Sequence, residues 1–170
     1  HIPLQSGDTE ILSKMRRNYN AEQYKHITRL AANRITPLGL GADVIVGFPG
    51  ESEKSFELTR KLIEELPFSY LHVFSYSPRS STEAYNFKNN IKNTIKKERN
   101  LILSNLVKEK AHLFYKSFIG KKITVLIEEP KLDGILKGYS EHYTPVRIET
   151  KSSLKNQLVP VVIKDVQKNE

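Results

Sequence analysis

The stretch that most constrains the fold is an apolar run followed by a glycine-rich turn and a helix, at residues 41–66. The run Val44-Ile45-Val46 is short and β-branched, which predicts a strand buried on both faces of a parallel sheet. A Gly-Phe-Pro-Gly-Glu turn follows, Ser52 is a suitable N-cap, and apolar positions then recur at helical spacing. Such loops lie at the carboxyl ends of parallel strands, where ligands bind, so residues 47–52 are the first candidate site.

Strands and helices alternate through the first part of the chain. An extended stretch at 1–4 leads to a helix capped by Asp8 or Thr9, a second helix is expected at 21–34, and a further strand at 70–74. This alternation predicts parallel strands joined by right-handed crossovers, in an open wound sheet or part of a barrel.

A long helix is expected from Asn90 to Phe118. Four apolar residues at spacings of seven, four and seven are predicted to face inward: Ile95, Ile102, Leu106 and Leu113. Its outer face is predicted to be basic, because residues 88–116 hold eight Lys or Arg against two Glu.

The composition changes at Gly120, where β-branched runs separated by turns begin. They lie at 123–127, 135–139, 145–148 and 159–166. Four or five short strands in about fifty residues predict a small closed barrel of the oligonucleotide-binding kind, because closure removes exposed edges. We expect an α/β domain at 1–117 and an all-β domain at 118–170.

Composition excludes several classes of protein. The 170 residues contain no cysteine, so they offer no disulfide, no thiolate nucleophile and no cysteine ligand for zinc or an iron–sulfur cluster. No apolar run is long enough to cross a bilayer and no signal peptide is recognisable, so a soluble, cytoplasmic protein without membrane contact is expected. The net charge of +8 indicates an anionic partner.

Four motifs, in this order and spacing, resemble the radical-SAM methylthiotransferases. They are Pro-Leu-Gln-Ser-Gly at 3–7, Met-Arg-Arg at 15–17, Asp-Val-Ile-Val-Gly-Phe-Pro-Gly-Glu at 43–51, and the stretch 68–79 ending in Ser-Tyr-Ser-Pro-Arg. The tail from Phe118 resembles the RNA-binding TRAM domain of those enzymes. The tail and Leu-His-Val-Phe at 71–74 are most similar to the branch that acts on N6-threonylcarbamoyladenosine beside the anticodon of tRNA.

The resemblance implies a fold and an activity. The chain would hold the later half of a (β/α) radical-SAM barrel followed by a TRAM barrel, from an enzyme that adds a methylthio group to C2 of the modified adenosine. The family's cluster-binding cysteines are absent from this chain, so S-adenosylmethionine and [4Fe-4S] clusters are expected in the full-length enzyme, and no cofactor is expected on this fragment. Ser52 and Ser81 depart from the family's usual Thr and Gly.

The motifs also imply binding residues. The cofactor set comprises Gln5, Ser6, Arg17, Asp43, Gly47, Phe48, Pro49, Gly50, Glu51, Tyr76 and Arg79. These residue types suit a nucleoside cofactor. Glycines allow the backbone to approach a nucleoside closely, apolar side chains can pack against it, and Glu51 can accept a hydrogen bond from a hydroxyl or an ammonium group. The set expected to contact RNA comprises Lys92, Lys96, Arg99, Lys121, Lys122, Lys137, Tyr139 and Arg147.

Plainer interpretations stay open for several of these residues. Arg17 can complement a helix dipole, His72 can be a hydrogen-bonded core residue, the basic helix can be a solvated surface, and Tyr139 can be barrel packing. Neither a metal site nor a catalytic residue is expected in this chain.

Two hypotheses remain. In the first, the chain is an enzyme fragment that is inert alone and has the tRNA anticodon stem-loop as its partner. In the second, it is a non-catalytic RNA-binding module with an α/β scaffold. A barrel cut before residue 1 would leave an edge strand at 1–4, through which we expect the fragment to dimerise.

Overall fold

The computed structural model describes residues 1–130, 134–150 and 154–167. The chain divides into two compact units, residues 1–111 and 112–170, which we call unit 1 and unit 2. None of the helices in the described residues is long and apolar enough to cross a membrane.

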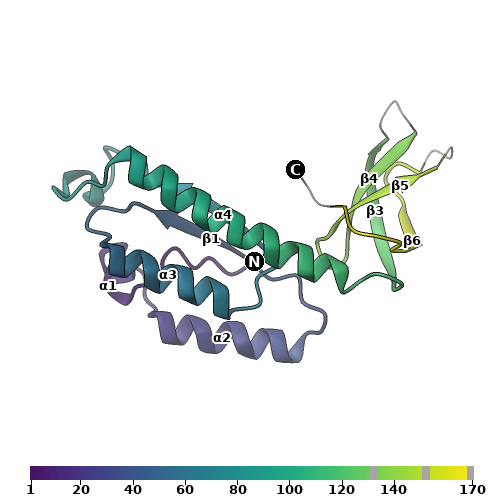
Figure 1. Cartoon of the computed structure of the whole chain (residues 1–170), viewed down its shortest axis with the longest axis horizontal. Coiled ribbons are helices and arrows are strands. Elements are labelled where there is room, and N and C mark those ends of the chain that lie inside the picture. Colours follow the sequence, from purple (N-terminus) through teal and green to yellow (C-terminus); the bar gives the residue numbers. More distant parts are fainter. Residues whose placement is uncertain (131–133, 151–153, 168–170) are drawn as a thin grey trace. The chain divides into compact units, whose positions relative to one another are not determined.

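Unit 1 alternates helices with parallel strands (Figure 1). Its elements are α1 (Thr9–Lys14), α2 (Ala21–Arg34), β1 (Gly41–Val46), α3 (Glu53–Glu65), β2 (Tyr70–Ser75), a 3₁₀ turn η1 (Glu83–Asn86) and α4 (Asn93–Lys116), whose last turn extends into unit 2. β1 and β2 pair in parallel, as predicted. The extended residues 2–5 add to the other side of β1, with Ile2 N donating to Gly41 O and Ile45 N donating to Gln5 O.

Three helices of unit 1 begin at capping residues, of which those of α1 and α3 were predicted and Asn20 was not. Asp8 accepts a hydrogen bond from the backbone of Glu10, and Asn20 forms a reciprocal capping box with Gln23. Ser52 accepts from Ser55 N, which confirms its prediction as the N-cap of α3. These caps fix where the chain turns from each loop into the helix that follows.

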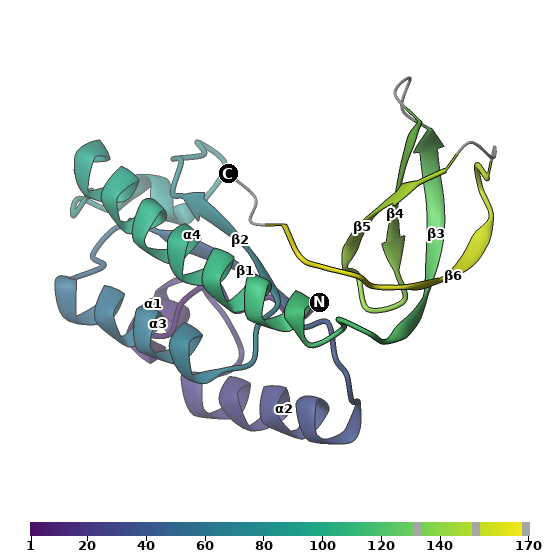
Figure 2. The same cartoon turned by 45° about the vertical axis from the view of Figure 1, so that its right-hand side comes forward.

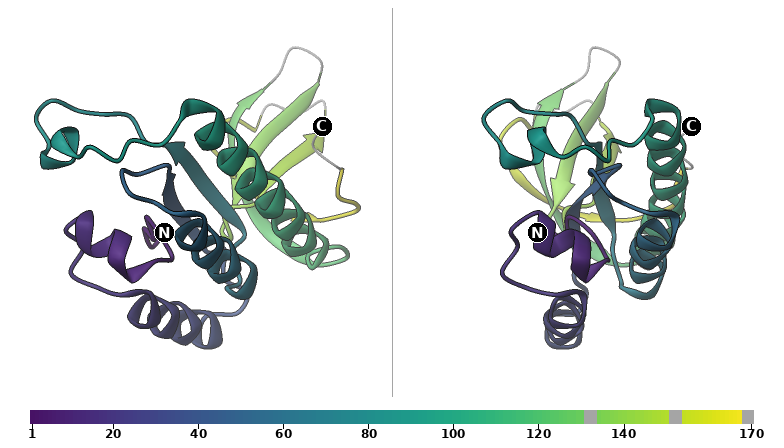
Figure 3. Two further views of the ribbon diagram at one scale, coloured as in Figure 1. Left: turned by 60° about the vertical axis from the view of Figure 1, so that its left-hand side comes forward. Right: turned by 90° about the vertical axis from the view of Figure 1, so that its left-hand side faces the viewer.

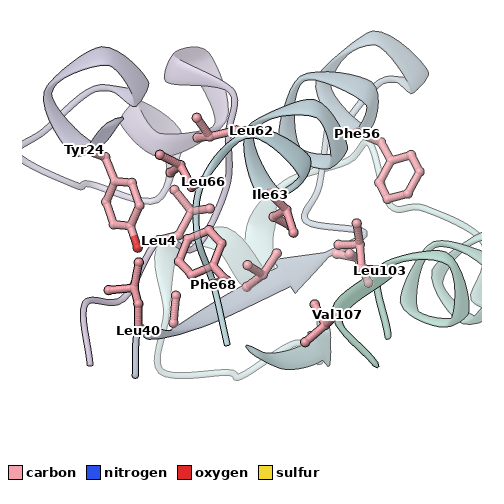
Figure 4. Close-up of a cluster of buried hydrophobic side chains, with 13 residues drawn as sticks. Leu4, Tyr24, Leu40, Phe56, Leu62, Ile63, Leu66, Phe68, Leu103 and Val107 are labelled. Atoms are coloured by element: carbon pink, nitrogen blue, oxygen red, sulfur yellow. The ribbon is translucent and has the colours of Figure 1, made fainter. Parts of the chain in front are cut away.

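The core of unit 1 lies on one face of β1. Ala42, Val44 and Val46 are fully buried there against Phe56 and Ile63 of α3 and against other apolar side chains of α2 and α4 (Figure 4). α3 and α4 run alongside β1 in the views from further sides (Figure 3). The helices thus hold the strand from one side.

The prediction that this strand is buried on both faces is wrong. Asp43 and Ile45, which point to the other face, are only half-buried, and Phe74 on β2 keeps 53% of its surface exposed. The described residues place no helix against that face, so the β-branched run is one-sided in its packing.

Unit 2 is a curled antiparallel sheet (Figure 2). Its strands are β3 (Lys122–Pro130), β4 (Ile135–Ser140), β5 (Pro145–Glu149) and β6 (Leu158–Val162), in the order β5-β4-β3-β6. Its core is Phe118 with the inward side chains of the strands. All four runs form strands, as predicted, but the predicted barrel closure is not seen, because β5 and β6 do not pair within the described residues.

Candidate functional site

Three strand ends of unit 1 meet at one edge of the sheet. The parallel register sets Gln5 beside Val44, and Val46 beside Ser75. The segments that follow, at 5–7, 47–51 and 76–79, therefore leave the sheet at the same edge, as the motif order predicted. This edge is the candidate site.

The first of these segments is held by α3. Thr59 accepts a hydrogen bond from Gly7 N at 2.9 Å, and its hydroxyl lies 3.3 Å from that of the fully buried Ser6. A Cβ on Gly7 would lie 2.6 Å from Thr59 Cα, so only glycine allows this approach. Ser6 is thus engaged inside the protein, while Gln5 adopts a φ of +66° that directs the chain out of the sheet.

The loop 47–51 is closed from within by Glu51. Its Oε2 accepts from Gly47 N at 2.7 Å, and Glu51 N donates to Phe48 O. Gly47 and Gly50 have φ of +73° and +85°, which side chains rarely adopt, so both glycines are needed for this turn. The loop is therefore closed on itself through the Glu51 carboxylate and the bond from Glu51 N to Phe48 O.

Arg99 on α4 pairs with Glu51 in the interior. Its Nη1 lies 2.5 Å from Glu51 Oε2 and also donates to Glu51 O, and its Nη2 lies 2.9 Å from Glu53 Oε2. The guanidinium also lies 5.1 Å from the ring centre of Phe56. Arg99 and Glu51 are 5% and 2% exposed, so α4 fastens the loop through a buried ion pair.

Burial raises the pKa of the Glu51 carboxyl group. Desolvation raises the pKa of its carboxyl group above the usual value, against the hydrogen bond from Gly47 and the charge of Arg99, which both lower it. Its Oε1 and the Nε of Arg99 are buried and have no hydrogen-bond partner. Glu51 therefore keeps one acceptor atom at the loop that its own structure does not use.

Aromatic rings stand beside the loop. The Phe48 and Tyr76 rings meet edge to face at 5.3 Å, and Phe87 meets Phe48 likewise at 6.1 Å. Lys96 Nζ donates to Tyr76 O at 3.0 Å and lies 5.3 Å from the Tyr76 ring centre. A Cβ on Gly47 would lie 2.3 Å from Lys96 Cγ, so α4 also packs directly on the turn.

The prediction that Lys96 and Arg99 lie on an exposed basic face is wrong. Both are buried, and with Leu103 and Val107 they form the inward face of α4. Two of the four residues predicted to face inward are turned away, since Leu113 is 68% and Ile102 37% exposed, whereas Ile95 and Leu106 are half-buried and Leu106 packs against the core of unit 1. The sequence did carry a signal for this inward face, because Lys96 and Arg99 share helical spacing with Leu103. Burial of paired charges, however, is not expected from sequence alone.

The remaining cofactor candidates are spread out. Arg17 and Arg79 are exposed, and no hydrogen bond or ion pair among the described residues joins either to the loop 47–51. Asp43 lies on the half-buried face, where its carboxylate is 3.2 Å from the His1 ring. Gln5, the loop 47–51 and Tyr76 are thus brought together, whereas the two arginines are not.

Unit 2 gathers part of the RNA set on one face. Lys122, Lys137, Tyr139 and Arg147 point away from the core, and Lys137 pairs with Arg147 in the register of β4 and β5. Lys121 precedes this face, with its amino group 5.9 Å from the Phe118 ring centre, and Lys92 is exposed in unit 1.

An apolar row crosses the same face of unit 2 and was not predicted. Tyr139 is paired with Leu126, and Leu126 with Leu158, which is 71% exposed. The Tyr143 ring stacks on Tyr139 at 5.1 Å. We call Tyr139, Tyr143, Leu126 and Leu158 the apolar row. The alternation along β3 gave no signal for it, because the outward neighbours of Leu126, namely Thr124 and Glu128, are polar.

Comparison with known proteins gives one consistent family. The chain is 38% identical over 98% of its length to a tRNA-2-methylthio-N(6)-dimethylallyladenosine synthase of Oceanobacillus iheyensis, and 41% identical over 96% to that of Geobacillus kaustophilus. It is 40% identical over 88% to a probable threonylcarbamoyladenosine tRNA methylthiotransferase of Methanocaldococcus jannaschii. It spans 33%, 31% and 34% of these relatives. No family model matches the chain.

The matched region is the carboxyl-terminal part of these relatives, and identity of 35–41% extends over nearly the whole chain. Both the α/β unit with the loop 47–51 and the curled sheet fall within it. As the counterpart of that part, this chain belongs to the tRNA methylthiotransferases.

Proposed function

We propose that this chain is part of an enzyme that adds a methylthio group to C2 of an N6-modified adenosine in the anticodon loop of tRNA. The observation that carries the proposal is the meeting of three strand ends around the closed loop 47–51, in a chain similar to tRNA methylthiotransferases. The alternative of a non-catalytic RNA-binding module gives no reason for this loop.

In the proposal, unit 1 binds the nucleoside part of S-adenosylmethionine. The two left-handed glycines let backbone groups approach a ligand, Phe48 and Tyr76 offer an aromatic wall, and the unused Oε1 of Glu51 accepts from a hydroxyl or ammonium group. The residues at the loop therefore fit this cofactor. Arg17 and Arg79, being exposed, would contact the cofactor or the tRNA only when these are bound.

The [4Fe-4S] clusters do not fit this chain, because its 170 residues contain no cysteine. In the enzyme the cluster would supply the electron that cleaves the cofactor. The chain alone is accordingly proposed to be inert in methylthiolation, and its dimerisation through residues 1–4 stays a prediction.

The target nucleoside is proposed to be N6-threonylcarbamoyladenosine, on the similarity of residues 71–74 and of the tail to that branch. The relatives named above include both the threonylcarbamoyl and the dimethylallyl branch, so the test must include both nucleosides.

A chimeric enzyme tests the function. The carboxyl-terminal third of the G. kaustophilus relative is replaced by this chain, and the chimera is expressed in a host that lacks its own methylthiotransferases and makes both modified adenosines. We expect the methylthio form of the threonylcarbamoyl nucleoside in hydrolysed tRNA, measured by mass spectrometry.

The matched control is the same chimera with Gly50→Val, which blocks the left-handed turn at φ +85° and should abolish the product. If only the dimethylallyl nucleoside is methylthiolated, the target nucleoside is that of the dimethylallyl branch and not of the threonylcarbamoyl branch. A folded, cluster-loaded chimera that modifies neither nucleoside would reject the proposal.

A further inference from the structure

We propose that a cleft beside the loop 47–51 binds a phosphodiester group of the tRNA next to the target nucleoside. The cleft has a volume of about 360 Å³ and is lined by Lys14, Pro49, Gly50, Asn86, Phe87, Lys88 and Asn89. It rests on the proposed function, since it presumes that the nucleoside binds at that loop.

The cleft is joined to the candidate site by direct contacts. Gly50 N donates to Asn89 O at 2.8 Å, which ties the loop to the segment after η1. Phe87 lies against Phe48, which in turn lies against Tyr76. A ligand in the cleft would therefore contact Pro49 and Gly50 of the same loop.

The cleft is positively charged. Its two ionisable side chains are Lys14 and Lys88, both exposed, and no acidic side chain of the described residues lies within 4.0 Å of either amino group. The nearby carboxylate of Glu83 is paired with Arg16, and that of Glu53 with Arg99. Neither Lys14 nor Lys88 has an acidic partner of this kind among the described residues.

The lining also suits a phosphate chemically. The Lys14 amino group lies 3.3 Å from where a Cβ on Gly50 would stand, so it lies over the glycine turn. Asn86 and Asn89 carry amide donors, and lysines with such amides are the groups that contact phosphate oxygens and fix the register of a bound nucleic acid. An uncharged part of the substrate would form no ion pair with Lys14 or Lys88.

The test is binding of anticodon stem-loop RNA to the 170-residue chain over a range of salt. Lys14→Gln with Lys88→Gln should weaken binding about fivefold at about 0.1 M salt and lower the magnitude of the log–log salt slope by about 0.7, because the variant no longer neutralises one phosphate. Lys61→Gln with Lys108→Gln, two exposed lysines on α3 and α4, removes the same charge elsewhere and should change neither quantity.

A second set of RNAs locates the phosphate. Each stem-loop carries one uncharged methylphosphonate linkage in the loop. We expect one linkage to weaken binding to the parent chain about fivefold and to have no effect on the Lys14→Gln, Lys88→Gln variant. Inorganic phosphate is then added as a competitor of the stem-loop. If phosphate at low concentration displaces the RNA from the parent chain, the cleft is a site for a free anion.

The outcomes separate the two claims. If the stem-loop does not bind the parent chain, the RNA step of the proposed function fails and this inference fails with it. If it binds but no linkage is coupled to the two lysines, the cleft proposal is overturned while the proposed function stands.

Discussion

Replacing Arg99 by Gln is expected to destabilise unit 1 by about 3–5 kcal/mol, because removing one partner of a buried ion pair leaves the other charge uncompensated. Glu51 is 2% exposed, and with Arg99 absent only Gly47 N donates to its carboxylate from within the loop. Urea denaturation followed by circular dichroism at pH 7 measures the change in the free energy of unfolding. The control Arg60→Gln removes an arginine from exposed pairs with Glu57 and Glu64 and should cost less than about 1 kcal/mol.

The cost should depend on pH in a defined direction. The pKa of Glu51 is already raised in the folded protein by burial, so the stability that its protonation contributes is present at low pH and is lost as pH rises through the folded pKa. Without the charge of Arg99 this pKa should rise further, so the variant loses stability over a wider range of pH. The difference between Arg99→Gln and the parent chain should therefore be smallest near pH 4 and largest at neutral pH.

The double variant Glu51→Gln with Arg99→Gln separates charge from packing. It leaves no buried charge of this pair, so it should recover most of the stability and lose the pH dependence. A double variant as unstable as Arg99→Gln, with the same pH profile, would show that packing of the guanidinium on Phe56 carries the effect and not the ion pair.

Local signals predicted the elements and the site edge well. Ser52 and the glycines of the turn 47–51 act through their own backbone, so their roles can be derived without knowing what packs on them. The same holds for α2, whose predicted bounds of 21–34 agree with the structure because Asn20 and Gln23 cap it. The parallel pairing of β1 and β2 followed from the helix between them.

The errors lie where tertiary contacts override local pattern. Lys96 and Arg99 look like surface residues in the sequence, and only their partners, Tyr76 O and Glu51, offset the cost of burying them. Likewise, Ile45 fits a strand covered on both faces, but what covers a face is set by other segments. Barrel closure depends on whether β5 reaches β6, which the spacing of strands does not determine.

Replacing Tyr139 and Tyr143 together by Ala is expected to weaken binding of anticodon stem-loop RNA by about 1–3 kcal/mol, roughly 5- to 150-fold in Kd, because one stacked base loses its platform. The two rings already stack on each other at 5.1 Å and are 40% and 59% exposed, so an unpaired base can extend the stack at little cost to folding. The apolar row places Leu126 beside Tyr139, which widens the surface. Fluorescence anisotropy with labelled stem-loop measures the change.

The salt dependence tells stacking from charge. The Tyr139→Ala, Tyr143→Ala variant should keep the log–log salt slope of the parent chain, because both tyrosines are uncharged and neutralise no phosphate. Lys121→Gln with Lys122→Gln should lower the magnitude of that slope by about 1.4, at about 0.7 for each phosphate that is no longer neutralised. Leu113→Ala, which truncates a 68% exposed side chain elsewhere in unit 2, should leave both affinity and slope unchanged. If the tyrosine variant folds and binds the RNA with unchanged affinity, the RNA binds to another face and the apolar row does not contact it.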